Sequence, residues 1–418
     1  MRIRVTGGQP LNGTYQPAGN TNAAIALLAA SMLVDEQSTI ANWPDTTTTA
    51  SMLKTAQRLG TRFSIDNDQT LTVQTEQILR RELAQQETGN LLYLAPILVR
   101  RGYIRLELDF PMQRIRTHLG AMRDLGLDVS SVDGAVEVRA SKWHFKDILL
   151  EEASVTATAI VVMLAACFGD ETVIRNAASE PHVQELCNML ERMGAQVHNV
   201  GSNMLRVFGG RQLHGVAEKV GPNHIEAASV AAMAAMSGGR VQIDGIRHGD
   251  MRMIDKIYQR LGIKLDLDEK MIFVPKHGDL ALSNRAEDVD ASIESAPWPG
   301  FPSDLMAIAT VIATQARGTA LIHEKLYNNR LLFIDKLNAM GAQIVLCDPH
   351  RAIVVGPSPL YPIYMDSPDV RAGLGMLAAA LLADGESVID NAQALRRSFD
   401  GVVGKLIKLG AQITIEGA

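Results

Sequence analysis

The sequence MGAQVHN, at residues 193–199, decides the fold because its pattern recurs along the whole chain. In every copy a Leu-Gly or Met-Gly pair ends a helix-like stretch, and a short β-prone run follows. Glycine readily adopts the left-handed backbone conformation that ends a helix before a strand. The other copies are LGTRFSI (59–65), LGLDVSS (125–131), LGIKLDL (261–267), MGAQIVL (340–346) and LGAQITI (409–415). Intervals of 66 to 79 residues between their glycines predict six repeats that fill the chain.

Each repeat is expected to hold two helices of different character. The stretch before the glycine is amphipathic, with apolar residues three or four positions apart, such as Leu186, Leu190 and Met193. An earlier, alanine-rich stretch such as EAASVAAMAAM (226–236) has almost no polar face and must therefore be interior. Two short strands split by turn residues follow the glycine. The pattern predicts an α/β fold of βαβαββ-type repeats.

The two ends of the chain are expected to meet. The last repeat stops after one strand, ITIEGA (413–418), and the chain opens on a β-prone run, RIRVTGG (2–8). If that run completes the sixth repeat, residues 1–19 and 222–418 form one domain of three repeats, and residues 20–221 form a second domain inserted within it. An open solenoid is the alternative. Repeats near 68 residues, each with sheet and buried helix, favour two closed domains.

Composition limits the class of protein. The 418 residues are 47% hydrophobic and 21% charged, which is typical of a globular chain. A net charge of −6 gives no electrostatic reason to expect nucleic acid or a membrane surface as partner. Three cysteines without a CxxC pair argue against zinc or disulfides, so we expect a reducing, cytoplasmic location. The N-terminus has no apolar signal segment, and the apolar run 153–168 suits a buried helix.

Five short motifs, in order and at suitable spacings, carry a resemblance to a known family. They are AGNTNAA (18–24), NAASEP (176–181), PGFPSD (299–304), NNR (328–330) and DVRA (369–372). With these motifs and its sixfold repeat, the chain resembles the enolpyruvyl transferases along essentially its whole length. The resemblance implies a two-domain inside-out α/β barrel with three repeats in each domain. It also implies transfer of an enolpyruvyl group from phosphoenolpyruvate to an acceptor hydroxyl, with no cofactor and no metal.

Three arginines are candidates for holding the anionic donor, because a planar guanidinium binds carboxylate or phosphate through two hydrogen bonds. Arg330 and Arg397 occupy corresponding strand-to-helix loops, and Arg371 lies in the first turn of an alanine-rich helix, where free N–H groups also attract anions. By resemblance, all three match arginines that contact phosphoenolpyruvate or the intermediate. Any one of them, taken alone, would be read as a surface arginine. Three at matching positions favour the binding role.

The chemistry also needs a base for the acceptor hydroxyl and an acid for the enol carbon. By resemblance, Asp304 matches the carboxylate beside that hydroxyl, and Asp369 is a second candidate catalytic carboxylate. Each could instead be a helix N-cap. Asn22 matches a substrate-binding asparagine, or it caps the buried helix that follows. Glu226, at the second domain crossover, is predicted to serve as a hinge or cap rather than in catalysis.

The chain departs from the family pattern in its first two repeats. Thr21 stands where the family has a lysine that contacts both substrates, so a substrate contact there would be an uncharged one. Thr88 replaces an arginine, and Glu152 replaces a lysine in the region that normally binds the uracil of the nucleotide sugar. Each change removes a positive charge that would favour an anionic ligand.

The mobile glycine-rich loop that carries the family's general acid is expected between Gly102 and His118, but the segment YIRLELDFPMQRIRT contains neither cysteine nor glycine. Asp109 could replace the acid, although strand alternation favours a surface position for it. Gln113 falls where an arginine is expected, and Arg114 and Arg116 could reach nearby or be ordinary surface residues. His118 is expected to make a structural hydrogen bond.

Three interpretations remain open. The first is an enolpyruvyl transferase whose acceptor differs from the usual nucleotide sugar. The second is a catalytically inactive paralogue that binds or regulates. The third is the peptidoglycan reaction with UDP-N-acetylglucosamine as acceptor. The expected partners are small anionic substrates, namely phosphoenolpyruvate and, in the third case, a nucleotide sugar. The acceptor and the oligomeric state do not follow from the sequence.

Overall fold

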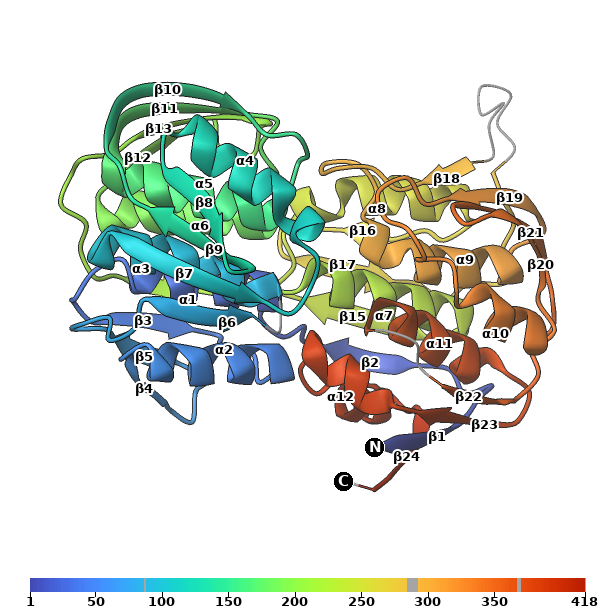
Figure 1. Ribbon diagram of the computed structural model, residues 1–418. Helices are drawn as coiled ribbons and strands as arrows, with labels where there is room; N and C mark the ends of the chain where they lie inside the picture. The colour runs from blue at the N-terminus through green and yellow to red at the C-terminus, as the bar shows by residue number, and fades with distance from the viewer. Residues whose placement is uncertain (86–87, 284–291, 367–369, 418) are drawn as a thin grey trace. The chain divides into compact units, whose positions relative to one another are not determined.

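A computed structural model describes residues 1–85, 88–283, 292–366 and 370–417 of the chain (Figure 1). The chain divides into two compact units. The C-terminal unit comprises Met1–Ala18 and Pro222–Ala418, and the inserted unit comprises Gly19–Gly221. In the described residues, each unit contains three four-stranded sheets.

All six described sheets share one strand pattern. An edge strand pairs in parallel with the second strand, and the remaining neighbours are antiparallel. In the inserted unit the sheets, in order of pairing, are β14 (Ala217–Lys219), β3 (Ser38–Ala41), β5 (Leu71–Gln74), β4 (Arg62–Ile65); β6 (Glu82–Gln85), β7 (Tyr103–Leu108), β9 (Ala135–Arg139), β8 (Asp128–Val132); and β10 (Trp143–Leu149), β11 (Gly169–Arg175), β13 (Met204–Phe208), β12 (Gln196–His198).

The C-terminal unit repeats the same arrangement. Its sheets are β2 (Asn12–Tyr15), β15 (Arg240–Asp244), β17 (Met271–Val274), β16 (Asp266–Leu267); β18 (Ser292–Glu294), β19 (Gly318–His323), β21 (Arg351–Gly356), β20 (Gln343–Asp348); and β22 (Tyr364–Asp366), β23 (Glu386–Asp390), β1 (Arg2–Thr6), β24 (Gln412–Glu416). The predicted βαβαββ repeat is confirmed, and so is the N-terminal strand that completes the sixth one, since β1 pairs with both β23 and β24.

Two helices belong to each repeat. The first of each pair is α1 (Thr21–Ser31), α3 (Leu94–Arg101), α5 (Val155–Phe168), α7 (His224–Met236), α9 (Met306–Gln315) or α11 (Val370–Leu382). The second is α2 (Thr47–Arg58), α4 (Arg116–Asp124), α6 (Pro181–Met193), α8 (His248–Arg260), α10 (Ile334–Ala339) or α12 (Val402–Lys408). Short 3-10 helices are η1 (Thr88–Tyr93), η2 (Met112–Ile115), η3 (Ser303–Leu305) and η4 (Ala392–Arg397).

The first helices lie inside the sheets, which gives the inside-out α/β barrel predicted from the sequence (Figure 1). Every residue of α7 from His224 to Ala235 is buried, as its lack of a polar face requires. In the C-terminal unit α7, α9 and α11 pack against one another. The second helices are amphipathic where the pattern predicts it: α8 buries Met251, Ile254, Ile257 and Tyr258. None of the helices described here has the length and apolarity that a membrane span needs.

The chain passes between the units twice. The strand before each passage pairs with a strand that lies far away in the sequence. β2 precedes α1 in the sequence but pairs with β15, which follows α7. β14 precedes α7 but pairs with β3, which follows α1. In each unit, one sheet therefore takes its edge strand from a distant part of the sequence: β2 in the C-terminal unit and β14 in the inserted unit.

Candidate functional site

The structure brings two of the predicted site residues together in the C-terminal unit. Nη1 of Arg330 donates to Oδ1 of Asp304 at 3.3 Å. The arginine side chain is 15% exposed and the aspartate side chain 32% exposed, so the pair is sheltered but still open to a ligand. The ring of Tyr327 lies under the guanidinium, 4.5 Å from its central carbon. Cation–π contact of this kind holds the plane of an arginine in place.

The loop that leads to Asp304 is fixed by its own backbone. Ala296 N–H donates to the carbonyl of Phe301, and Gly300 N–H donates to the carbonyl of Pro297. The Trp298 ring packs edge-on against His224 at the start of α7, with 5.5 Å between ring centroids. These contacts tie the proline-rich segment to the buried helix, and they set where the chain enters η3.

Asp304 is not a helix N-cap, contrary to the alternative interpretation of the sequence. It lies inside η3, and the N-cap of α9 is Leu305, which makes no side-chain capping bond. A 3-10 turn therefore separates the proline-rich loop from the helix. The carboxylate of Asp304 forms its ion pair with Arg330 instead of capping the helix.

The other predicted donor-binding residues lie on neighbouring elements of the same unit. Asp369 lies outside the described residues, and Arg371 is the second residue of α11, with its side chain outside the described part. Arg397 is exposed and ends η4. The helix α11 contacts α9, which follows Asp304, and also α10, which follows Arg330, and η4. The backbone thus gathers the segments next to Asp304, Arg330 and Arg397 around α11, which carries Arg371.

The first crossover segment shows that the cap of α1 is Asn20, not Asn22. The Asn20 side-chain oxygen accepts from the N–H groups of Asn22 and Ala23. Asn22 is exposed, whereas Thr21 is 3% exposed and begins the helix. Position 21, where the resemblance expects a lysine, therefore carries a buried neutral side chain.

Glu226 lies in the C-terminal unit next to the point where the chain returns at Pro222. Its Oε1 accepts from the Tyr15 hydroxyl at 2.7 Å, from Lys405 Nζ at 3.1 Å and from the Ala18 N–H at 3.3 Å. Burial raises the pKa of this carboxyl, and Lys405 opposes the rise. The cap of α7 is Asn223, so the predicted capping role of Glu226 is wrong. The hinge role stays a prediction.

The segment expected to hold a lid is short. β7 ends at Leu108 and η2 begins at Met112, so only residues 109–111 connect them. Asp109 is exposed, as strand alternation predicts. Gln113 and Arg114, in η2, are exposed too.

Two titratable residues of α4, Arg116 and His118, already have partners. Arg116 forms ion pairs with Glu151 at 3.2 Å and with Glu152 at 3.0 Å. His118 Nε2 lies 2.7 Å from Thr156 Oγ1, which confirms the structural hydrogen bond, and burial lowers the pKa of His118 to about 4. The positive charge of Arg116 is therefore already balanced by Glu151 and Glu152.

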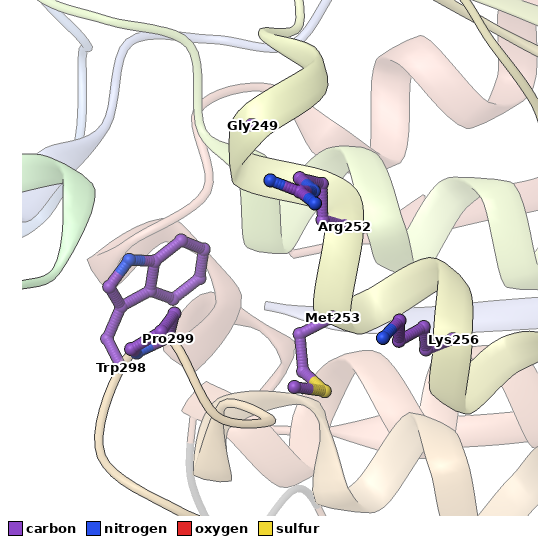
Figure 2. Close-up of a pocket in the computed structure, with 6 residues that line it drawn as sticks. All are labelled: Gly249, Arg252, Met253, Lys256, Trp298 and Pro299. Atoms are coloured by element: carbon purple, nitrogen blue, oxygen red, sulfur yellow. The ribbon is translucent and has the colours of Figure 1, made fainter.

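A cavity of about 270 Å³ lies between α8 and the loop before Asp304. Figure 2 shows Trp298 and Pro299 facing Arg252, Met253 and Lys256 of the helix. Asp304 and Arg330 are not among the lining residues, so this cavity is separate from their ion pair.

Sequence reasoning missed one residue of this region, Glu324. It follows β19 directly and is fully buried, and its carboxylate accepts hydrogen bonds from the loops that carry Asp304 and Arg330. The only signal was an acidic residue at the end of the β-prone run TALIHE (319–324). Nothing in that run indicates partners 21 and 29 residues away.

Comparison of the sequence with known proteins identifies the family of the chain. Residues 5–406 match the family described as EPSP synthase (3-phosphoshikimate 1-carboxyvinyltransferase). A Treponema denticola protein named UDP-N-acetylglucosamine 1-carboxyvinyltransferase is 39% identical over 420 residues, covering 99% of this chain and 98% of that protein. A Borreliella burgdorferi protein of the same name is 37% identical over 417 residues, covering 98% and 97%.

Solved structures show the same fold. The enolpyruvyl transferase NikO from Streptomyces tendae superposes with a TM-score of 0.87 at 22% identity, covering 99% of this chain and 98% of its own. EPSP synthase from Acinetobacter baumannii gives a TM-score of 0.76 at 15% identity and full coverage of both chains. The fold and the full-length matches define a transferase of the inside-out barrel type. The chain belongs to the EPSP synthase family of enolpyruvyl transferases.

Proposed function

We propose that the protein transfers the enolpyruvyl group of phosphoenolpyruvate to a hydroxyl of an acceptor other than UDP-N-acetylglucosamine, with release of phosphate. The observation that carries the proposal is the sheltered ion pair of Asp304 with Arg330. It joins a carboxylate that can accept a hydroxyl proton to a cation that can hold an anionic donor.

Each residue has a role in this proposal. Arg330, Arg371 and Arg397 hold the carboxylate and phosphate of the donor. Asp304 acts as the base for the acceptor hydroxyl, and Asp369 is a second catalytic carboxylate. Thr21 and Asn22 contact substrate through neutral hydrogen bonds. No cofactor takes part, and a cytoplasmic location belongs to the same proposal.

The acceptor is proposed to differ because the altered positions lie in the inserted unit. A buried threonine at position 21 brings no charge to a phosphate. Arg116, which could have replaced a missing cation, is already paired with Glu151 and Glu152. A nucleotide sugar, whose diphosphate is negatively charged, would bind beside two carboxylates that share a single arginine. Such a surface favours an acceptor of lower negative charge.

The second candidate is the UDP-N-acetylglucosamine reaction itself. The 39% identity to the Treponema denticola protein, over nearly the full length of both chains, favours it. An inactive, ligand-binding paralogue is the third candidate, because the connection at residues 109–111 leaves no room for a mobile lid that would exclude water.

Phosphate release separates the three candidates. Purified protein is incubated with phosphoenolpyruvate, first with UDP-N-acetylglucosamine and then with neutral and singly charged sugar or nucleoside acceptors. The proposal predicts release only with acceptors of the second set. Release with UDP-N-acetylglucosamine at a comparable rate would favour the second candidate. Phosphoenolpyruvate binding without release under any condition would favour the third.

A further inference from the structure

The strand β19 ends in a buried carboxylate that joins two loops. Glu324 is fully buried, and its two oxygens divide their donors. One oxygen accepts from Ser295 Oγ at 2.8 Å, Leu326 N–H at 2.9 Å and Tyr327 N–H at 3.2 Å. The other accepts from Ser303 Oγ at 2.6 Å. Among the described residues no cation forms an ion pair with Glu324, and the donors to its carboxyl group are two hydroxyls and two backbone N–H groups.

Each loop that Glu324 holds carries one member of the Asp304–Arg330 pair. Ser303 immediately precedes Asp304 in η3. Tyr327, whose N–H is fixed by the carboxylate, supplies the ring that stacks on Arg330. The backbone of Glu324 is itself anchored, because its N–H donates to the carbonyl of His350 at 2.8 Å. The carboxylate is therefore a rigid bridge between the supports of both side chains.

We propose that Glu324 is a positioning residue that sets the distance and angle between Asp304 and Arg330. The inference rests on the proposed function for its catalytic meaning, but the geometry can be tested without catalysis. A shift of about 1 Å in a reacting group costs on the order of 10²-fold in rate, so fixing both supports from one buried point has a clear use.

Ser303 and Ser295 offer a matched pair of tests. Both hydroxyls donate to Glu324, but only Ser303 adjoins Asp304. Ser303→Ala leaves one carboxylate oxygen without its donor, whereas Ser295→Ala leaves the other oxygen with two N–H donors. Glu324→Gln is a third variant. Because it replaces an acceptor with an NH₂ group among four donors, it is expected to unfold more readily and is not needed for the decision.

The decisive measurement is a double-mutant cycle of Asp304→Asn and Arg330→Gln, read as thermal midpoints. In the wild-type background the two losses in midpoint should be non-additive, because the pair is coupled. If Glu324 is a positioning residue, the two losses in thermal midpoint should become additive in the Ser303→Ala background. In the Ser295→Ala background, the coupling between Asp304 and Arg330 should be unchanged. Equal coupling in all three backgrounds, or equal loss with both serine variants, would overturn the inference.

Kinetics then connect the geometry to the reaction. With an acceptor that supports phosphate release, Ser303→Ala should lower kcat tenfold or more and change the phosphoenolpyruvate KM by less than threefold. Ser295→Ala should stay within twofold in both. If kcat falls equally in the two variants, Glu324 only stabilises the loops. If the wild type releases no phosphate, the proposed function fails, and the thermal cycle still decides the role of Glu324.

Discussion

The C-terminal unit buries two carboxyl groups, Glu226 and Glu324, whose hydrogen-bond donors are distributed in different ways. Glu324 receives four neutral donors shared between both oxygens. Glu226 receives all three of its donors, one of them the ammonium of Lys405, on a single oxygen. Its Oε2 is buried with no hydrogen-bond partner among the described residues. A buried carboxylate with one unsatisfied oxygen favours its protonated form.

The stability of the protein should therefore depend on pH through Glu226. Its pKa is raised by burial from an ordinary value of 4.5, so the folded state retains this proton when the unfolded state has lost it. As pH rises from about 4.5 through the folded pKa, the free energy of unfolding should fall for the wild type relative to Glu226→Gln. Tyr15 and Lys405 are the titratable groups that contact the carboxyl, and Asp400 acts on Tyr15.

Urea unfolding at a series of pH values from about 4 to 8 checks this dependence. Glu107→Gln is the control, because it removes one exposed carboxylate of β7. Wild type and control should show parallel curves, and Glu226→Gln should diverge from both. Three parallel curves would mean that Glu226 does not titrate as its burial implies.

At the scale of elements, α9 and α11 approach each other closely where the first turn of α9 meets the second turn of α11. A Cβ added at Gly375 would lie 2.8 Å from the Cβ of Ala307. Gly375 is one helical turn beyond Arg371, and Ala307 is three residues beyond Asp304. The glycine therefore lets α9, which follows Asp304, and α11, which carries Arg371, approach each other.

Gly375→Ala should push α9 and α11 apart and lower the free energy of unfolding by roughly 1–3 kcal/mol. Gly404→Ala is the matched control, because Gly404 also lies in a helix but a Cβ there meets nothing within 4 Å. The control should be stabilising by about 0.5–1 kcal/mol, since alanine is the better helix former. Equal effects of the two variants in chemical denaturation would contradict the proposed contact.

The elements were predictable where the signal is local. The helix-ending glycines, the alanine-rich interior helices and the completion of the last repeat by β1 are confirmed. The alternative interpretation of Asn22 as the cap of α1 is wrong, because N-T-N at residues 20–22 offers two asparagines and the side chain of Asn20 makes the capping hydrogen bonds. The alternative interpretation of Asp304 as a helix N-cap is wrong because a 3-10 turn separates it from α9.

The candidate site was predictable only in part, because its supports are non-local. The Asp304–Arg330 contact joins residues named from separate motifs. Glu324 was missed, since its hydroxyl donors come from residues far along the chain and no spacing rule points to them. The roles of Asp369, Arg371 and Arg397, and the division into domains at residues 19 and 222, stay predictions.

At the scale of the whole molecule, the proposed reaction requires that phosphoenolpyruvate binds through arginines of the C-terminal unit. Isothermal titration of the wild type, Arg397→Ala and Arg396→Ala with phosphoenolpyruvate tests this most directly. Arg396 is the control because it is exposed beside Arg397 in η4.

We expect the wild type and Arg396→Ala to bind phosphoenolpyruvate with the same affinity, and Arg397→Ala to lose roughly 1.5–3 kcal/mol of binding free energy, about 10- to 150-fold in Kd. Absence of binding by the wild type, or equal affinity of all three proteins, would contradict this expectation.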